Sequence, residues 1–141
     1  MSGAIPQPVS QGDYIPARRF AGVIHTSGMT PRRGGVLQMQ GPVRQDVPVE
    51  EYRAAVELAC TNALSAAHGV LAEGERLAGV LSMTVYVAAE PGFEVHSRLA
   101  DFASALLRRE MGDAGIGARA AVGVANLPGN APVEIQIVAH V

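Results

Sequence analysis

The chain contains 141 residues with a net charge of −2, and 48% of them are hydrophobic, which suits a single globular domain over residues 1–141. All 11 basic residues are arginine, so the absence of lysine excludes Schiff-base catalysis by lysine and a P-loop. The low charge argues against a nucleic-acid partner, and no apolar run is long enough to span a membrane. We therefore expect a cytoplasmic protein that binds neither nucleic acid nor a membrane.

The first half of the sequence predicts a loosely held lead-in, two strands and a long helix. The first strand alternates apolar and polar residues between turn signals at Gly22 and Pro31. The helix opens at a proline, and Glu50 and Glu51 lie where acidic side chains stabilise a helix N-terminus. In chain order, these elements are expected over residues 1–11, 23–29, about 36–39, and 48–74.

The second half predicts a strand, a helix and two closing strands. The strand is rich in β-branched residues and places Leu81, Met83, Val85 and Val87 on one face. The turn residues "LPGNAP" join the last two strands. In chain order, these elements are expected over residues 79–89, about 92–112, 118–126 and 132–141. The whole order, ββαβαββ, predicts an α+β fold in which both helices cover one face of the sheet.

The two closing strands have one face that the helices are expected to cover and one that they are not. On the covered face we expect Val122, Val124, Val133, Ile135, Ile137 and Ala139. On the other face we expect Arg119, Ala121, Gly123 and Ala125 of one strand, with Glu134, Gln136, Val138 and His140 of the next. This second face is too small-featured for a core and too apolar for water, so it is predicted to pack against another subunit.

Several motifs are present without the context that their chemistry requires. "GIGARA", from Gly115 to Ala120, has the spacing of a dinucleotide fingerprint, but a helix precedes it and a strand follows. The four histidines show no paired spacing, and Cys60 is the only cysteine, so we expect no metal site. Ser27 has no assignable base and fits a turn beside Gly28 better than a nucleophile.

Arg119 and Glu134 are the candidate functional pair. Arg119 is the one charged residue in the strand "GARAAVGVANLP" and has no obvious partner among its sequence neighbours. Its guanidinium presents a planar fork of donors to a carboxylate, while a glutamate nearby could hold or activate water. A simple salt bridge between the two residues explains the sequence equally well.

The two ends of the chain resemble the signatures of the RidA family, also called YjgF or L-PSP. The segments that carry the likeness are "GDYIPARRFAGVIHTSGMTP" and "GARAAVGVANLPGNAPVEIQIVAHV", and the resemblance extends from Gly12 to Val141. It implies a chorismate-mutase-like fold assembled as a homotrimer with clefts between subunits. It also implies hydrolytic deamination of reactive enamines and imines, such as 2-imino acids, to 2-oxo acids and ammonia without a cofactor.

The resemblance further implies roles for particular residues. Arg119 would bind the substrate carboxylate, so its partner would be this ligand and not a residue of its own chain. Glu134 would position the attacking water, while Tyr14, Ser27 and Gly28 would line the same cleft. Three other cleft positions depart from the family pattern: Met29 replaces a glutamine, Ala121 replaces a cysteine found in many members, and Asp101 aligns with an asparagine. These departures leave a non-catalytic or regulatory trimer that binds a small carboxylate as the main alternative. An endoribonuclease is the second alternative.

Overall fold

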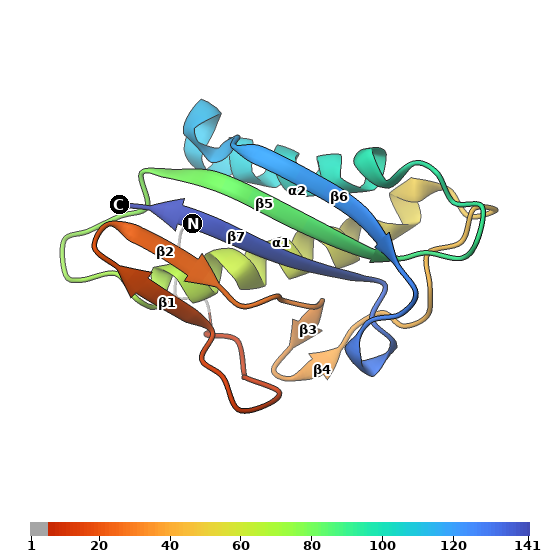
Figure 1. Ribbon diagram of the computed structural model, residues 1–141, viewed down its shortest axis with the longest axis horizontal. Helices are drawn as coiled ribbons and strands as arrows, with labels where there is room; N and C mark the ends of the chain where they lie inside the picture. Colours follow the sequence, from red (N-terminus) through yellow and green to blue (C-terminus); the bar gives the residue numbers. More distant parts are fainter. Residues whose placement is uncertain (1–5) are drawn as a thin grey trace.

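A five-stranded mixed sheet forms the body of the structure, a computed structural model that describes residues 6–141 (Figure 1). The strand order is β1-β2-β7-β5-β6, with β5 and β6 parallel and the other pairs antiparallel. The strands are β1 (Ala17–Phe20), β2 (Val23–Thr26), β5 (Gly79–Ala88), β6 (Ala118–Val124) and β7 (Val133–His140). A separate small hairpin consists of β3 (Arg32–Arg33) and β4 (Val36–Leu37).

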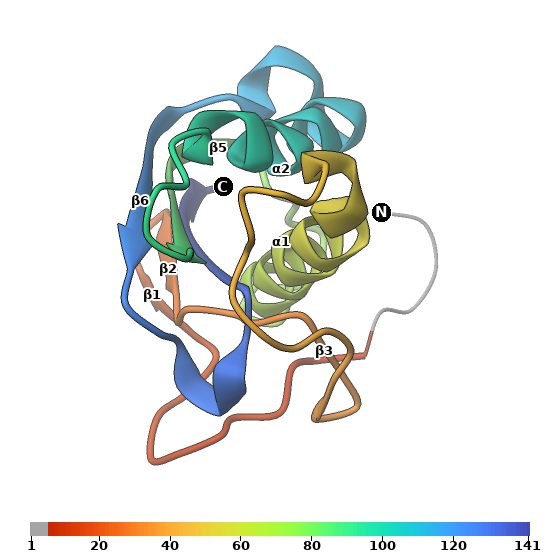
Figure 2. The ribbon, with the colours of Figure 1, turned by 90° about the vertical axis from the view of Figure 1, so that its right-hand side faces the viewer.

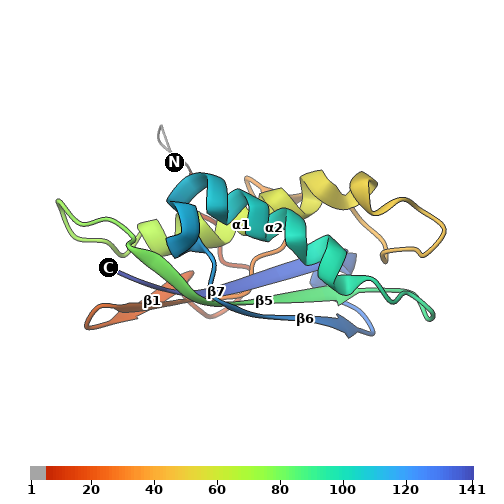
Figure 3. The same cartoon turned by 90° about the horizontal axis from the view of Figure 1, so that it is seen from above.

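Both long helices, α1 (Arg53–His68) and α2 (His96–Met111), pack on the same face of the sheet (Figures 2 and 3). Their buried residues follow helical spacing, as in Leu99, Ala103 and Leu106 of α2. Short 3₁₀ helices lie at Val49–Tyr52, Gly112–Gly115 and Pro128–Asn130. The α+β class and the one-sided helical layer are as the sequence predicted. Between residues 6 and 141, no helix is both long and apolar enough to cross a membrane.

The first edge of the sheet differs from the prediction. The sequence did not predict β1, whose residues read ARRF and leave Phe20 85% exposed. A distant ion pair anchors this strand: Arg19 binds Glu75, and the hydrogen bond from Arg19 lowers the pKa of Glu75 to about 2. Such a contact leaves no trace in the local pattern, because edge strands need not alternate when neither face is fully covered.

The predicted first-half elements are also shorter than expected. The strand expected over 23–29 ends at Thr26, although Met29 still exchanges two backbone hydrogen bonds with Ile135. The strand expected over 36–39 is only the two-residue β4, and α1 ends at His68. Of the lead-in expected over 1–11, residues 1–5 lie outside the described residues. Within the remainder, the Gln7 amide donates to the Ser65 carbonyl of α1 at 2.7 Å.

A bulge in β5 overturns one detail of the predicted faces. The register of β5 against β7 shifts between Val80 and Ser82, and the intervening Leu81 is 48% exposed. Met83, Val85 and the following alternate residues remain buried beneath the helices. Leu81 was predicted to share their face and does not, because the extra residue interrupts the two-residue side-chain period.

Candidate functional site

Arg119, near the start of β6, is held by the side of α2. Its Nη1 donates to Oδ1 of Asp101 at 2.8 Å and to Oγ of Ser104 at 3.0 Å. Its Nη2 donates to Oγ of Ser97 at 2.7 Å and to the Ser97 carbonyl at 3.4 Å. We call Arg119, Ser97, Asp101 and Ser104 the Arg119 cluster. The expectation that Arg119 has no partner in its own chain is therefore wrong.

The predicted faces of β6 are reversed. Arg119 lies opposite Met83 in the parallel ladder, and Met83 is buried under the helices. Ala121 packs against the core on that side, and a Cβ at Gly123 would lie 2.7 Å from the His96 ring of α2. Val122, expected beneath the helices, is 40% exposed on the other face. The strand has small residues on both sides, and its one apolar alternation, Val122 with Val124, favours the side that the helices leave uncovered.

Glu134 lies on the uncovered face of β7, as predicted, and its carboxylate meets the backbone at the end of β2. A Cβ on Gly28 would fall 2.3 Å from Oε2 of Glu134, so only glycine allows this approach without moving the carboxylate. Burial raises the pKa of Glu134 above its ordinary value. Within the described part of the chain, no hydrogen bond or ion pair to this carboxylate offsets the burial.

Ser27 and Tyr14 lie in two different loops, Ser27 just after β2 and Tyr14 before β1. Ser27 donates from Oγ to the Ile15 carbonyl at 2.7 Å and from its backbone to Pro16 at 2.8 Å, which ties the loop before β1 to the end of β2. Tyr14 is exposed, and its hydroxyl accepts from the Gln11 backbone at 3.1 Å. We call Tyr14, Ser27, Gly28, Met29 and Glu134 the Glu134 cluster.

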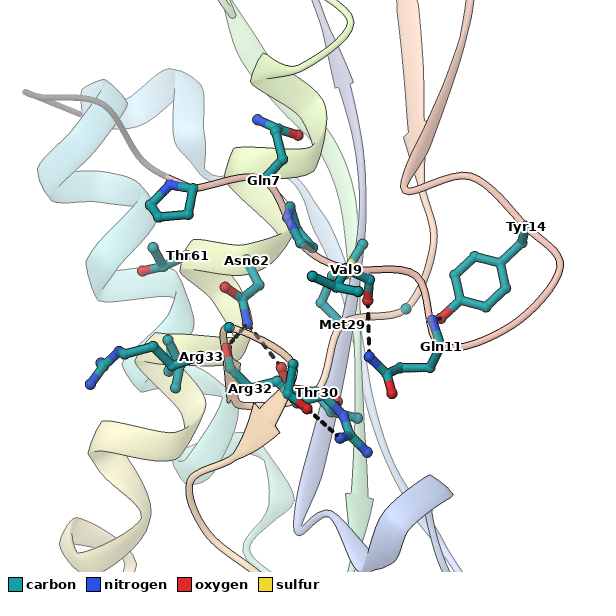
Figure 4. Close-up of a pocket in the computed structure, with 16 residues that line it drawn as sticks. Gln7, Val9, Gln11, Tyr14, Met29, Thr30, Arg32, Arg33, Thr61 and Asn62 are labelled. Carbon is teal, nitrogen blue, oxygen red and sulfur yellow. Dashed lines mark hydrogen bonds between the residues drawn. The ribbon is translucent and has the colours of Figure 1, made fainter.

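A cavity of about 320 Å³ opens beside this cluster (Figure 4). Tyr14, Gly28 and Met29 line it together with the segment 6–11, the turn 30–35 and one side of α1. Asn62 of α1 fixes the turn, because its amide donates to the carbonyls of Thr30 at 3.0 Å and Arg32 at 2.8 Å. The structure therefore gathers three of the predicted substrate-binding residues around one cavity.

The two clusters lie far apart in one chain. Arg119 is on the helix-covered face of β6, whereas Glu134 is on the opposite face of β7, and β5 separates the two strands. Two strand spacings amount to about 10 Å before the thickness of the sheet is added. Arg119 and Glu134 form no salt bridge, since Arg119 pairs with Asp101. Within a single chain, they cannot contact the same small ligand.

A family model for endoribonuclease L-PSP matches residues 4–141 of the sequence. The chain belongs to this family. It is 32% identical over 114 residues to Protein TCP17 of Trypanosoma cruzi, and the match covers 80% of this chain and 71% of that protein. A protein of unknown function from Agrobacterium tumefaciens is 32% identical, with a TM-score of 0.86, and the match covers 97% of this chain and 86% of that one.

The L-PSP fold is also evident in a more distant structure. The YjgF gene product of E. coli superposes with a TM-score of 0.67 at 21% identity, covering 95% of this chain and 92% of the other. This likeness supports the fold alone. The family and fold that the sequence predicted are thus confirmed, and the roles of individual residues stay predictions.

Sequence reasoning missed two members of the Arg119 cluster in this L-PSP chain. Ser97 and Ser104 flank Asp101 at intervals of four and three residues, so all three side chains lie on the side of α2 that faces β6. The polar stripe SxxxDxxS beside an apolar helix face was a visible signal. This stripe could be interpreted as a set of partners for Arg119 only if the face of β6 that carries Arg119 was known, and the sequence of the strand did not specify that face.

Proposed function

We propose that this protein hydrolyses reactive imines and enamines of the 2-imino acid type to 2-oxo acids and ammonia, without a cofactor. Membership of the L-PSP family and the presence of both signature residues, Arg119 and Glu134, support the proposal. The observation that carries it is the division of these residues between two clusters with complementary properties. One cluster presents an oriented cation, and the other presents a desolvated carboxyl beside a cavity.

The working site would be formed by two copies of the chain, within a homotrimer. Ala118, Ala120 and Val122 leave the uncovered face of β6 small and exposed, and no helix packs there (Figure 3). A sheet face of this kind is suited to close packing against an identical sheet. A neighbouring copy would then bring its Glu134 cluster to the Arg119 edge of the first, which a single chain cannot do.

The chemistry follows from these two groups. The Arg119 guanidinium binds the ligand carboxylate and turns the imine carbon toward Glu134 of the adjoining copy. Glu134 accepts a proton from water as the water oxygen bonds to the carbon of the protonated imine, giving a carbinolamine with a hydroxyl and an amino group. Glu134 then passes this proton to the amino nitrogen. The carbon–nitrogen bond breaks as the carbinolamine hydroxyl gives its proton to Glu134, so that a 2-oxo acid and ammonia form, and Glu134 passes this last proton to the ammonia. A carboxyl whose pKa is raised by burial is better matched to proton exchange near neutral pH than an exposed one.

Complementation between variants tests this arrangement. Purified Arg119→Ala and Glu134→Gln proteins should each release ammonia from 2-iminobutanoate no faster than buffer. Co-expressed in equal amounts, they should regain about one quarter of wild-type activity, because an interface is intact only when each neighbour supplies its unaltered residue. Absence of recovery in mixed trimers would contradict the shared site, and a wild-type trimer without activity would contradict the deaminase.

A non-catalytic carboxylate-binding trimer is the second candidate. The departures at Met29 and Asp101 favour it, because these predicted cleft positions differ from the pattern of the deaminases that the chain resembles, while Arg119 is retained. Wild-type protein that binds 2-oxobutanoate but leaves imine hydrolysis unaccelerated would decide for this candidate. The family is named for an endoribonuclease, so RNA cleavage is assayed on the same proteins. Cleavage that persists in Arg119→Ala would indicate a site other than the one proposed here.

A further inference from the structure

The four Nη hydrogens of Arg119 are all engaged by its own chain. Two go to Asp101 and Ser104, and two go to the hydroxyl and carbonyl oxygens of Ser97. A guanidinium has five N–H donors, so only the Nε hydrogen has no partner among the described residues. A ligand carboxylate that seeks the two-pronged grip of this arginine must first displace one of these acceptors.

Asp101 is the acceptor that a ligand carboxylate most resembles. It offers the same group, at 2.8 Å from Nη1, and it is the only one of the three α2 residues with a negative charge. The two side chains differ in burial, since Arg119 is 22% exposed and Asp101 is 65% exposed. The arginine is therefore fixed between β6 and α2, while the aspartate reaches it from the surface and has solvent into which it can turn.

We propose that Asp101 is a specificity-determining residue that occupies the carboxylate position on Arg119 and is displaced when a substrate carboxylate binds. The inference rests on the proposed function, because it takes Arg119 as the carboxylate-binding group. It implies that the resting site selects against small ligands whose only anchor is a carboxylate. Substrates would need further binding energy elsewhere, which a larger side chain could gain from the cavity beside Tyr14 and Met29 of the adjoining copy.

Competition by Asp101 predicts a change in selectivity and not only in affinity. Asn in place of Asp101 keeps an oxygen that accepts from Nη1 but removes the negative charge. The variant Asp101→Asn should therefore bind 2-oxobutanoate about fivefold more tightly than wild type, since partly exposed ion pairs are weak and their removal frees the cation. Binding of the neutral 2-oxobutanamide should be unchanged, so the ratio of the two dissociation constants is the readout.

Two further variants separate competition from a positioning role. Asp101→Ala should tighten 2-oxobutanoate binding at least as much as Asp101→Asn if Asp101 competes, and should weaken it if Asp101 holds Arg119 in place. Asp113→Asn is the matched control. Asp113 lies just beyond the end of α2 and forms an exposed ion pair with Arg108, so the variant removes the same charge from a pair that does not involve Arg119. It should leave both dissociation constants unchanged.

The outcomes by isothermal titration calorimetry on the intact oligomer are distinct. Tighter and selective carboxylate binding in both Asp101 variants supports the proposal. Equal binding by wild type and Asp101→Asn, or weaker binding by Asp101→Ala, overturns it while leaving Arg119 as a carboxylate site. If no variant binds the carboxylate at millimolar concentration while all remain folded, the proposed function and the role of Asp101 both fail.

Discussion

The Arg119 cluster and the Glu134 cluster treat their charges in opposite ways. The guanidinium is paired, held by four hydrogen bonds and fixed between β6 and α2. The Glu134 carboxyl is half-buried against Gly28, has no hydrogen-bond or ionic partner among residues 6–141, and has a raised pKa. The first arrangement stabilises one orientation of a cation, and the second keeps a proton acceptor poorly solvated.

If Arg119 binds the ligand and Glu134 exchanges the proton, as proposed, this contrast separates the task of binding from the task of proton transfer. A group that orients a ligand gains from being fixed in advance, because the cost of ordering it is met during folding. A group that exchanges protons gains from an environment that shifts its pKa toward neutrality. Variants at Arg119, Gly28 and Glu134 should each remove a property that distinguishes one cluster from the other.

The largest effect is expected at Arg119. Replacement by alanine removes at least two charge-assisted hydrogen bonds to a ligand carboxylate, so kcat/KM for imine hydrolysis should fall at least about 100-fold. Arg119→Lys should fall nearly as far, because a single ammonium cannot replace the planar fork that meets Asp101, Ser104 and Ser97 together. Steady-state ammonia release measures both variants.

A second arginine provides the control for this experiment. Arg108 lies on α2 and, like Arg119, pairs with an aspartate, but its partner is Asp113 and the pair is exposed. Arg108→Ala should keep wild-type kinetics. Near-normal activity in Arg119→Lys would show that charge alone suffices and would remove the argument for two-pronged recognition.

The sequence predicted the elements that carry their own local pattern. The second half of the chain met this condition: β5 and β7 alternate β-branched residues, and α2 repeats apolar residues at helical spacing. These elements are confirmed with boundaries that differ by a few residues. Glu134 was placed on the correct face for the same reason, because its neighbours Val133 and Ile135 identify the buried side.

The sequence failed where the deciding contact is distant or the residues are all small. β1 depends on the bond from Arg19 to Glu75, 56 residues away along the chain. β6 has alanine or glycine on both faces, so either assignment buries little apolar area, and the choice is made by hydrogen bonds from Arg119 to α2. That single reversal hid the partners of Arg119.

An intermediate effect is expected from Gly28→Ala, which acts on Glu134 without changing it. The added methyl group would fall 2.3 Å from Oε2, and the displaced atoms are the end of a flexible side chain, so the fold should survive. The carboxylate should move away from its position, and kcat should fall about tenfold or more with a smaller change in KM. Stopped-flow detection of imine loss, combined with circular dichroism, measures activity and folding together.

A nearby glycine tests whether the effect is specific. Gly22 lies between β1 and β2, and a Cβ there would meet only Val141 at an ordinary contact distance of 3.5 Å. Gly22→Ala should therefore be as active as wild type. Full activity in Gly28→Ala would mean that the position of the Glu134 carboxylate is not important for the reaction.

The smallest effect is expected in the stability of Glu134→Gln. Burial raises the pKa of Glu134 from its ordinary value of 4.5, so the folded state binds this proton more tightly than the unfolded state does. The stability that this proton confers is complete below pH 4.5 and is lost as the pH rises through the folded pKa. Once the pH has risen through the folded pKa, the wild type carries a poorly solvated charge that glutamine lacks.

The melting temperature of Glu134→Gln at pH 7 should therefore exceed that of wild type by roughly 2 °C, and the difference should narrow toward pH 4. The exposed Glu94 gives the control, since Glu94→Gln relieves no burial and should leave the melting temperature unchanged. Thermal unfolding followed by circular dichroism at both pH values measures the difference. A lower melting temperature for Glu134→Gln at pH 7 would show that the carboxylate is stabilised in the assembled protein, and the two clusters would then no longer differ in the treatment of their charges.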